Sequence, residues 1–271
     1  MRQNNEPPAA PQAGSPAGIL LSEVTKTFST VSPPVEAIRL LDMSVPDGAF
    51  AALIGPSGCG KSTALRMIAG LDLPTTGTVQ TGGLPPAEAV RSHQVGVAFQ
   101  DPGLLPWRSV RRNVLLALEV VGRRDSEARV DELIEMVGLA EFKKARPAEL
   151  SGGMRQRVAL ARTLVTSPKV LLLDEPFGAL DEFTRERLNR ELQDLWLGLR
   201  PTTLLVTHSI LEAVYLSDFV VVMSERPGRV IGRFTVPFAR PRPYDIVETS
   251  DFLALSREIG HCLRSSMPAE T

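Results

Sequence analysis

The sequence is short of cysteine, of net charge and of long apolar runs, and each shortage excludes a class of protein. Its 271 residues include two cysteines, Cys59 and Cys262, which lie far apart and form no disulfide framework, as suits a reducing compartment. A formal net charge of −1 gives no electrostatic basis for binding nucleic acid. No apolar run reaches the roughly 18–20 residues that cross a bilayer. We therefore expect a cytoplasmic protein that reaches a membrane only by docking to another protein.

The chain divides into three segments. Residues 1–18 are rich in proline, alanine and glycine and lack the apolar core of a secretion signal, so we expect a disordered tail. Residues 19–230 are expected to form the main globular domain. Residues 231–271 form a C-terminal extension with one predicted amphipathic helix, for which Ser250 is the expected N-cap. The apolar face of this helix comprises Phe252, Leu255, Ile259 and Leu263.

Short apolar runs alternate with helical patterns in the main domain. Strands are predicted at Ile38–Val45, Ala49–Ile54, Val95–Phe99, Val170–Leu173, Thr203–Val206 and Phe219–Met223. Helical periodicity predicts a helix over Lys61–Ala69 and an inserted helical lobe over about 101–164. Apolar helical faces are formed by Leu133, Ile134 and Val137 in the lobe and, later, by Leu188, Leu192, Leu195 and Leu199. Strands that alternate with helices favour an α/β fold with a mostly parallel sheet.

A glycine-rich segment directly after a predicted strand matches the phosphate-loop pattern G-x-x-x-x-G-K-[ST]. Glycines let backbone N–H groups turn toward phosphate oxygens, and the start of the following helix adds partial positive charge. Lys61 is expected to reach the outer phosphates, and the Ser62 hydroxyl to bind Mg²⁺. An incidental glycine-rich turn is the alternative, but the order strand, loop, helix favours a nucleotide site. The expected contacts are Gly55, Pro56, Ser57, Gly58, Cys59, Gly60, Lys61, Ser62 and Thr63.

Cys59 lies inside this loop, close to the start of the predicted helix. A thiol near a helix N-terminus can have a lowered pKa, and Cys59 would then be reactive when the site is empty. The alternative is that Cys59 is a small residue that fills space within the loop.

Two adjacent carboxylates follow another apolar strand. Asp174 and Glu175 come directly after Val170–Leu173, and ligands of open α/β sheets bind at the carboxyl ends of the strands. Asp174 is expected to face Mg²⁺, and Glu175 to act as general base on the attacking water. A solvated turn is the alternative. Two neighbouring acids beside a phosphate require a counter-charge, which argues for Mg²⁺.

A third segment lies between the phosphate loop and the acidic pair. Ser151 offers a hydroxyl, and Gly152 and Gly153 offer bare backbone N–H groups at the start of a helix expected from about Met154. The run from Leu150 to Arg157, which includes Gln156, resembles the signature segment of the ATP-binding-cassette (ABC) family. The resemblance implies a phosphate-loop NTPase core with an antiparallel β subdomain and an inserted α-helical subdomain, and Ser151, Gly152, Gly153 and Gln156 as nucleotide-binding residues.

The resemblance assigns roles to four further residues. Phe28 resembles the aromatic residue that stacks on adenine, although many relatives have Tyr there, and a core phenylalanine is the alternative. Gln100 resembles the glutamine that touches Mg²⁺ and the attacking water. His208 resembles the switch histidine that contacts the γ-phosphate. Asp181 resembles the loop that communicates across a dimer.

The resemblance also implies partners. Two copies are expected to pair head to tail, so that the signature segment of one closes over ATP bound to the other. The family further implies membrane-spanning permease subunits and, indirectly, a solute-binding protein. Three segments are similar to the nitrate, sulfonate and taurine importer group: Gln100–Trp107, His208–Asp218 and Met223–Val230. The function implied is hydrolysis of ATP to energise import, on the inner face of the membrane.

The segment from Gln100 to Trp107 is where the family receives a coupling helix of the permease. Trp107 and Leu104–Leu105 are candidate apolar anchors for that helix, and packing within the helical lobe is the alternative.

Two competing functions are considered. A soluble ABC ATPase that acts on nucleic acid or the ribosome usually carries paired cassettes, a long coiled coil or basic patches, and the sequence shows none of these. A phosphate-loop kinase would not need the signature segment, and a pure nucleotide-binding module would need neither Glu175 nor His208.

Overall fold

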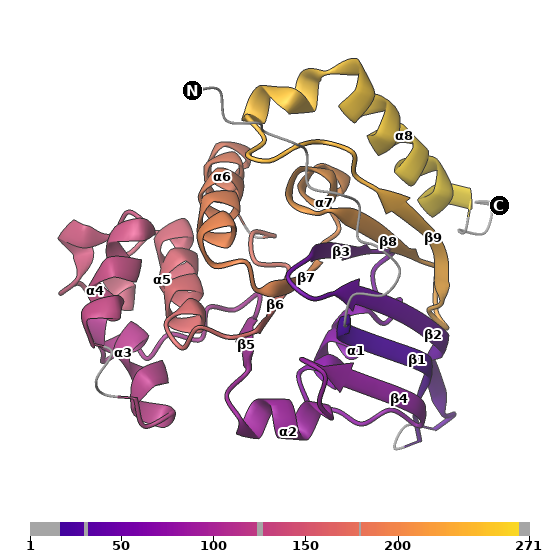
Figure 1. Cartoon of the computed structure of the whole chain (residues 1–271), viewed down its shortest axis with the longest axis horizontal. Coiled ribbons are helices and arrows are strands. Elements are labelled where there is room, and N and C mark those ends of the chain that lie inside the picture. Colours follow the sequence, from indigo (N-terminus) through magenta and orange to yellow (C-terminus); the bar gives the residue numbers. More distant parts are fainter. Residues whose placement is uncertain (1–16, 30–31, 124–126, 179, 266–271) are drawn as a thin grey trace, which may run out of the picture.

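The computed structural model describes residues 17–29, 32–123, 127–178 and 180–265 (Figure 1). The tail expected over residues 1–18 therefore lies almost wholly outside the described residues. Two β-sheets organise the chain, with helices on both faces of the larger one. The fold class predicted from the sequence, α/β with a parallel sheet, an antiparallel sheet and a helical part, is confirmed.

The larger sheet has six strands in the order β5-β6-β7-β3-β8-β9. Its strands are β3 (Phe50–Ile54), β5 (Val95–Ala98), β6 (Val170–Asp174), β7 (Thr202–Val206), β8 (Phe219–Met223) and β9 (Val230–Thr235). All of its neighbouring pairs are parallel except β8 with β9. Strands β3, β7 and β8 are buried along their whole length, which explains their unbroken apolar sequences.

A smaller antiparallel sheet has the strand order β2-β1-β4. It consists of β1 (Ala17–Phe28), β2 (Val35–Pro46) and β4 (Thr76–Thr81). Its inner face packs on one side of the six-stranded sheet together with α1 (Lys61–Ile68), so that Ile19, Leu21 and Ile38 share a core with Leu65. The sequence predicted β2, but it did not predict β1 or β4 as separate strands.

Three helices form a lobe beside the sheets (Figure 1). They are α3 (Val110–Val120), α4 (Glu127–Met136) and α5 (Gly152–Leu164), with the 3₁₀ turns η2 (Ala140–Phe142) and η3 (Pro147–Glu149) between the last two. The apolar face predicted for the lobe is confirmed, because Leu133, Ile134 and Val137 are buried. Helix α5 begins at Gly152, not at Met154, because the Ser151 hydroxyl caps the helix by accepting from the Met154 N–H at 3.3 Å.

The first of the remaining helices packs against β4, and the other three cover the face of the larger sheet opposite α1. They are α2 (Pro86–Arg91), α6 (Glu182–Leu199), α7 (Ile210–Leu216) and α8 (Ser250–Ser265), with the turn η4 (Tyr244–Glu248) before α8. The predicted faces of α6 and α8 are confirmed, since Leu188, Leu192, Phe252 and Ile259 are buried. The predicted N-cap of α8 is wrong: the hydroxyl of Thr249, not Ser250, accepts from the Phe252 N–H at 3.4 Å.

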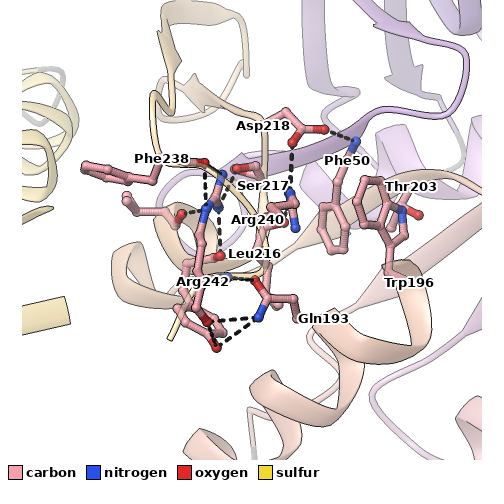
Figure 2. A network of polar contacts seen from close by, with 12 residues as sticks. Phe50, Gln193, Trp196, Thr203, Leu216, Ser217, Asp218, Phe238, Arg240 and Arg242 are labelled. Atoms are coloured by element: carbon pink, nitrogen blue, oxygen red, sulfur yellow. Dashed lines mark hydrogen bonds and ion pairs between the residues drawn. The ribbon is translucent and has the colours of Figure 1, made fainter. Parts of the chain in front are cut away.

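The segment after Val230 is part of the folded body. Strand β9 pairs with β8, so the six-stranded sheet continues beyond the boundary expected at residue 230. Arg240 and Arg242 then lie next to the ends of α6 and α7 (Figure 2). The Arg242 guanidinium donates to the carbonyl oxygens of Val214, Tyr215 and Ser217 at 2.9, 2.7 and 2.8 Å. Among the described residues, no helix has both the length and the apolar content of a membrane span.

Candidate nucleotide-binding site

The glycine-rich loop between β3 and α1 has the backbone geometry of a phosphate cradle. Gly58 and Gly60 adopt positive φ values of 75° and 105°, a region that residues with a Cβ enter at a cost. Gly60 directly precedes the first residue of α1, Lys61. The loop therefore directs the N-terminus of α1, with its free N–H groups, toward the space above it.

Lys61 turns its ammonium group back into the loop. Its Nζ donates to the carbonyl oxygens of Gly55 at 2.8 Å and Pro56 at 2.9 Å, and the residue is buried. These contacts keep the charge next to the loop, and no carboxylate among the described residues forms an ion pair with it. A phosphate group in the cradle would offer a stronger acceptor, because a charge-assisted hydrogen bond exceeds a bond to a neutral carbonyl.

Cys59 does not have the environment of a reactive thiol. Its side chain is 1% exposed and packs in the core below the antiparallel sheet. Burial raises the pKa of the thiol, and this effect outweighs the lowering by the charge of Lys61. The expectation of a reactive Cys59 is therefore wrong, because the side chain is buried in the core. Cys59 is the small residue that fills space under the loop.

Two side chains that the sequence assigned to Mg²⁺ lie together. Ser62 Oγ donates to Asp174 Oδ1 at 3.1 Å, which joins α1 to the end of β6. Burial, and secondarily the charge of Glu175, raise the pKa of Asp174. No group of three or more histidine, cysteine or acidic side chains could hold a metal within the described ranges. Ser62 and Asp174 nevertheless fit Mg²⁺, because this ion binds few protein ligands and completes its shell with water and substrate phosphates.

Gln100 is not part of this pair. It follows β5 at the edge of the sheet and is exposed. In the part of the chain that the structure describes, no hydrogen bond joins its side chain to Ser62 or Asp174. Its role at the metal stays a prediction.

Glu175 and His208 lie together at the ends of β6 and β7. His208 Nδ1 is 3.4 Å from Glu175 Oε2, and the Glu175 N–H donates to the Val206 carbonyl at 2.8 Å. Glu175 adopts a φ of 45°, a strained value for a residue with a long side chain. Such strain persists where surrounding structure enforces it, and functional sites concentrate it.

A cavity of about 350 Å³ opens above the glycine-rich loop. This volume falls within the roughly 300–1,000 Å³ of small-molecule sites. Ser57, Gly58, Gly60, Lys61, Ser62 and Thr63 form its floor, and Phe28, Val35, Ala37, Glu175 and Arg226 complete its wall. Phe28, at the end of β1, is half-buried, and Lys26 Nζ lies 5.0 Å from the centre of its ring. The core alternative for Phe28 does not hold, because the ring borders the cavity.

Arg226, Val35 and Ala37 were not singled out from the sequence. Arg226 reaches the cavity because Gly228 bonds to β2: its N–H donates to the Ala37 carbonyl at 2.9 Å, and its carbonyl accepts from the Arg39 N–H at 3.0 Å. The segment Met223–Val230, which contains Arg226, was singled out from the sequence, but only for its similarity to an importer group. Its proximity to the glycine-rich loop depends on β8 lying beside β3.

The signature segment belongs to the helical lobe and does not line this cavity in the described chain. Ser151 is exposed and still has its hydroxyl hydrogen to donate, because its cap bond uses the oxygen as acceptor. Gly153 packs against α6, where an added Cβ would lie 2.8 Å from Thr184 Cγ2. Gln156 faces inward, and its amide donates to the Phe99 carbonyl at 3.4 Å. Its visible contact is therefore with the loop before Gln100.

Asp181 begins α6. Its Oδ1 accepts from the Thr184 N–H at 3.0 Å, and that hydrogen bond holds the pKa of the carboxyl below its usual value. Ala179, beside this loop, lies outside the described residues. The exposed Asp181 is thus at the molecular surface, next to a helix start.

Comparison with known proteins indicates the same family as the sequence motifs. Residues 38–178 match the family model described as ABC transporter. The chain is 46% identical to the nitrate import ATP-binding protein NrtD of Synechococcus elongatus, with 87% of each chain covered. It is 44% identical to the aliphatic sulfonates import ATP-binding protein SsuB of Bacillus subtilis, with 89% and 92% covered.

A solved structure agrees with these relatives. The dimeric ATP-binding cassette MJ0796, in a post-hydrolysis state with ADP and phosphate, superposes with a TM-score of 0.70 at 30% identity. The match covers 80% of this chain and 98% of that one. The predicted family resemblance is confirmed by these findings together with the loop, the acidic pair and the cavity. The chain therefore belongs to the ABC transporter family, as an ATP-binding cassette that hydrolyses ATP.

Proposed function

We propose that the chain energises an importer of small anions, and that two copies hydrolyse ATP at their shared interfaces. The observation that carries the proposal is the cavity in which the glycine-rich loop, Phe28 and Glu175 face one space. Its lining suits a nucleotide with the base at Phe28 and the phosphates at Lys61. The relatives named as nitrate and aliphatic sulfonate import proteins support a small anionic solute.

The residues of one copy bind the nucleotide and prepare the water. Loop N–H groups and Lys61 hold the phosphates, while Asp174 and Ser62 would hold Mg²⁺. The cation would supply positive charge that offsets the charge developing on the phosphate oxygens. Glu175 accepts a proton from water as the oxygen attacks the terminal phosphorus, and ADP leaves. His208 lies next to Glu175, and its proposed role is to contact the terminal phosphate.

The second copy completes the site. Ser151, at the start of α5, is exposed on the helical lobe and does not line the chain's own cavity. Anions bind well at such a helix start. A head-to-tail pair brings this segment over the terminal phosphate of its partner, as the dimeric form of MJ0796 supports.

The membrane partner is a membrane-spanning permease, which the chain binds on the cytoplasmic face of the membrane. Trp107 is 69% exposed, whereas Leu104 packs partly against the core of the lobe. Of the candidate anchors, Trp107 is thus the most exposed, Leu105 is partly exposed, and Leu104 follows the alternative of packing within the lobe. Together with a solute-binding protein, the permease determines which anion is carried, because the cassette itself does not touch the solute.

The Glu175→Gln variant tests the proposal. We expect steady-state hydrolysis to fall by at least about 100-fold, because the amide cannot accept the proton from water. ATP binding should persist, so that dimers accumulate with ATP and Mg²⁺ in size-exclusion chromatography. Glu248→Gln, at an exposed acid far along the chain, is the control and should hydrolyse normally. Near-normal phosphate release by Glu175→Gln would refute the general-base role.

A further inference from the structure

Helices α6 and α7 each begin directly after a loop of the nucleotide site, and one buried acid lies between their first turns. Helix α6 follows Asp181, and α7 follows His208 and its cap Ser209. The acid is Glu212, in the first turn of α7, and it is 3% exposed. The proposed chemistry does not use this carboxylate. A buried charge that the chemistry leaves unused requires another explanation.

One oxygen of Glu212 holds the loop that carries His208. The Thr207 hydroxyl donates to Glu212 Oε2 at 2.5 Å, and the same hydroxyl oxygen accepts from the Ser209 N–H at 3.0 Å. These two bonds fix the backbone on both sides of His208. The imidazole itself is mostly exposed, so its direction depends on this backbone.

The other oxygen faces the first turn of α6. Arg185 Nε lies 3.6 Å from Glu212 Oε1. A second nitrogen of the same guanidinium donates to the Leu180 carbonyl at 2.9 Å. Leu180 directly precedes Asp181, which caps α6. One arginine thus binds the loop before α6 and, through Glu212, the loop before α7.

The cost of this arrangement argues for a use beyond helix packing. Burial raises the pKa of Glu212, and the bond from Thr207 and the charge of Arg185 only partly oppose that effect. An apolar pair of similar volume commonly packs two helices at no loss of stability. What an apolar pair cannot do is bond to polar groups of both loops at once.

We propose that the Arg185–Glu212 pair is a positioning device that keeps the Leu180–Asp181 loop and the Thr207–Ser209 loop in one fixed relation. Docking of a second copy against Asp181 then also determines where His208 stands. The inference rests on the proposed function, because it takes Asp181 to face the partner and His208 to face the terminal phosphate. Hydrolysis is thereby made to depend on closure of the dimer.

The test uses the full chain with Glu212→Gln and Arg185→Gln, assayed for hydrolysis and for nucleotide binding. We expect kcat to fall by about 10- to 100-fold, as small displacements of reacting groups do. The Kd for ATP should stay within about twofold, because neither residue lines the cavity. Glu212→Gln keeps an oxygen that can accept from the Thr207 hydroxyl. A fall in kcat of this variant therefore reports the loss of the ion pair alone.

Glu182→Gln is the matched control. Glu182 is the exposed partner of Arg185, with its Oε2 at 3.2 Å from the guanidinium. The variant therefore removes a negative charge paired with Arg185 and leaves Glu212 in place. It should hydrolyse ATP like the unaltered chain. An equal loss of kcat in Glu182→Gln would overturn the proposal.

The double variant Arg185→Gln/Glu212→Gln separates positioning from folding, because it buries no unpaired charge. A shared device predicts that its kcat is no lower than that of the worse single variant. Should Arg185→Gln fail to fold, the double variant carries the test. Folded variants with unaltered kcat, or a Kd for ATP that weakens in parallel with kcat, would overturn the inference. Failure of the proposed function looks different, since the unaltered chain would then release no phosphate.

Discussion

Gly60 serves the fold and the site at the same position. Its φ of 105° lies in a region that glycine adopts without steric strain, and it precedes the first residue of α1. A Cβ at this position would lie 2.9 Å from Ile38 Cγ1 and 3.0 Å from the Ala37 carbonyl oxygen. The antiparallel sheet therefore presses on the loop from outside while the phosphate cradle opens on the other side.

Gly60→Ala should destabilise the nucleotide-free chain more than Gly58→Ala. Gly58 also has a positive φ, but a Cβ there meets nothing within 4 Å. We expect Gly58→Ala to lower the free energy of unfolding by about 1–2 kcal/mol through backbone strain alone. Gly60→Ala adds a clash and should cost roughly 2–4 kcal/mol. Urea denaturation measures both, and equal losses would contradict the role of the sheet contact.

At the scale of elements, α7 depends on the C-terminal segment (Figure 2). The last carbonyl groups of a helix have no partner within it. Here Arg242 takes those of Val214 and Tyr215, and Arg240 takes that of Leu216. Burial lowers the pKa of Arg242 to about 9, so the group remains charged at neutral pH. Its counter-charge is the negative end of the helix.

Arg242→Gln should therefore destabilise the whole chain. The residue is 2% exposed, and the change leaves several buried carbonyl groups without a donor. We expect the free energy of unfolding to fall by about 3 kcal/mol or more. Arg190→Gln, at a largely exposed side chain over the Tyr244 ring, should cost under about 1 kcal/mol. Thermal unfolding of both variants checks the difference, and a similar loss in both would count against it.

At the scale of the whole molecule, the two parts of the proposed catalytic site lie on different lobes. The cavity belongs to the part with the two sheets, whereas Ser151 caps α5 of the helical lobe. A head-to-tail pair joins the cavity of each copy to the signature segment of the other. Two such copies bury the same two surfaces twice, and the assembly closes.

Mixing two inactive variants should restore activity. Lys61→Ala removes the phosphate contact, and Ser151→Arg blocks the signature segment. Each variant alone should be nearly inactive, because both of its sites are damaged. A mixed dimer has one site with an intact Lys61 and an intact Ser151, so random mixing should recover about a quarter of full activity. Phosphate release measures this, and a mixture no more active than its components would exclude the head-to-tail pair.

Local patterns in the sequence predicted most elements of the sheet and the helices. Strand β3 and the loop after it were evident because an unbroken apolar run and a glycine-rich motif stand side by side. Strands β1 and β4 were not, because half-exposed strands such as Thr76–Thr81 have no strong pattern. The N-cap of α8 was misassigned by one residue, since Thr249 and Ser250 are both good caps and only the backbone selects between them.

The sequence by itself determined the chemistry: a glycine-rich loop with Lys61, two acids after an apolar strand, and a Ser-Gly-Gly helix start. Only the tertiary structure decided which of these groups meet. It joined Ser62 to Asp174 and Glu175 to His208, brought Arg226 to the cavity, and turned Cys59 into the core. The reason is physical: motifs follow from residue types along the chain, whereas proximity follows from strand order and burial, which distant segments settle together.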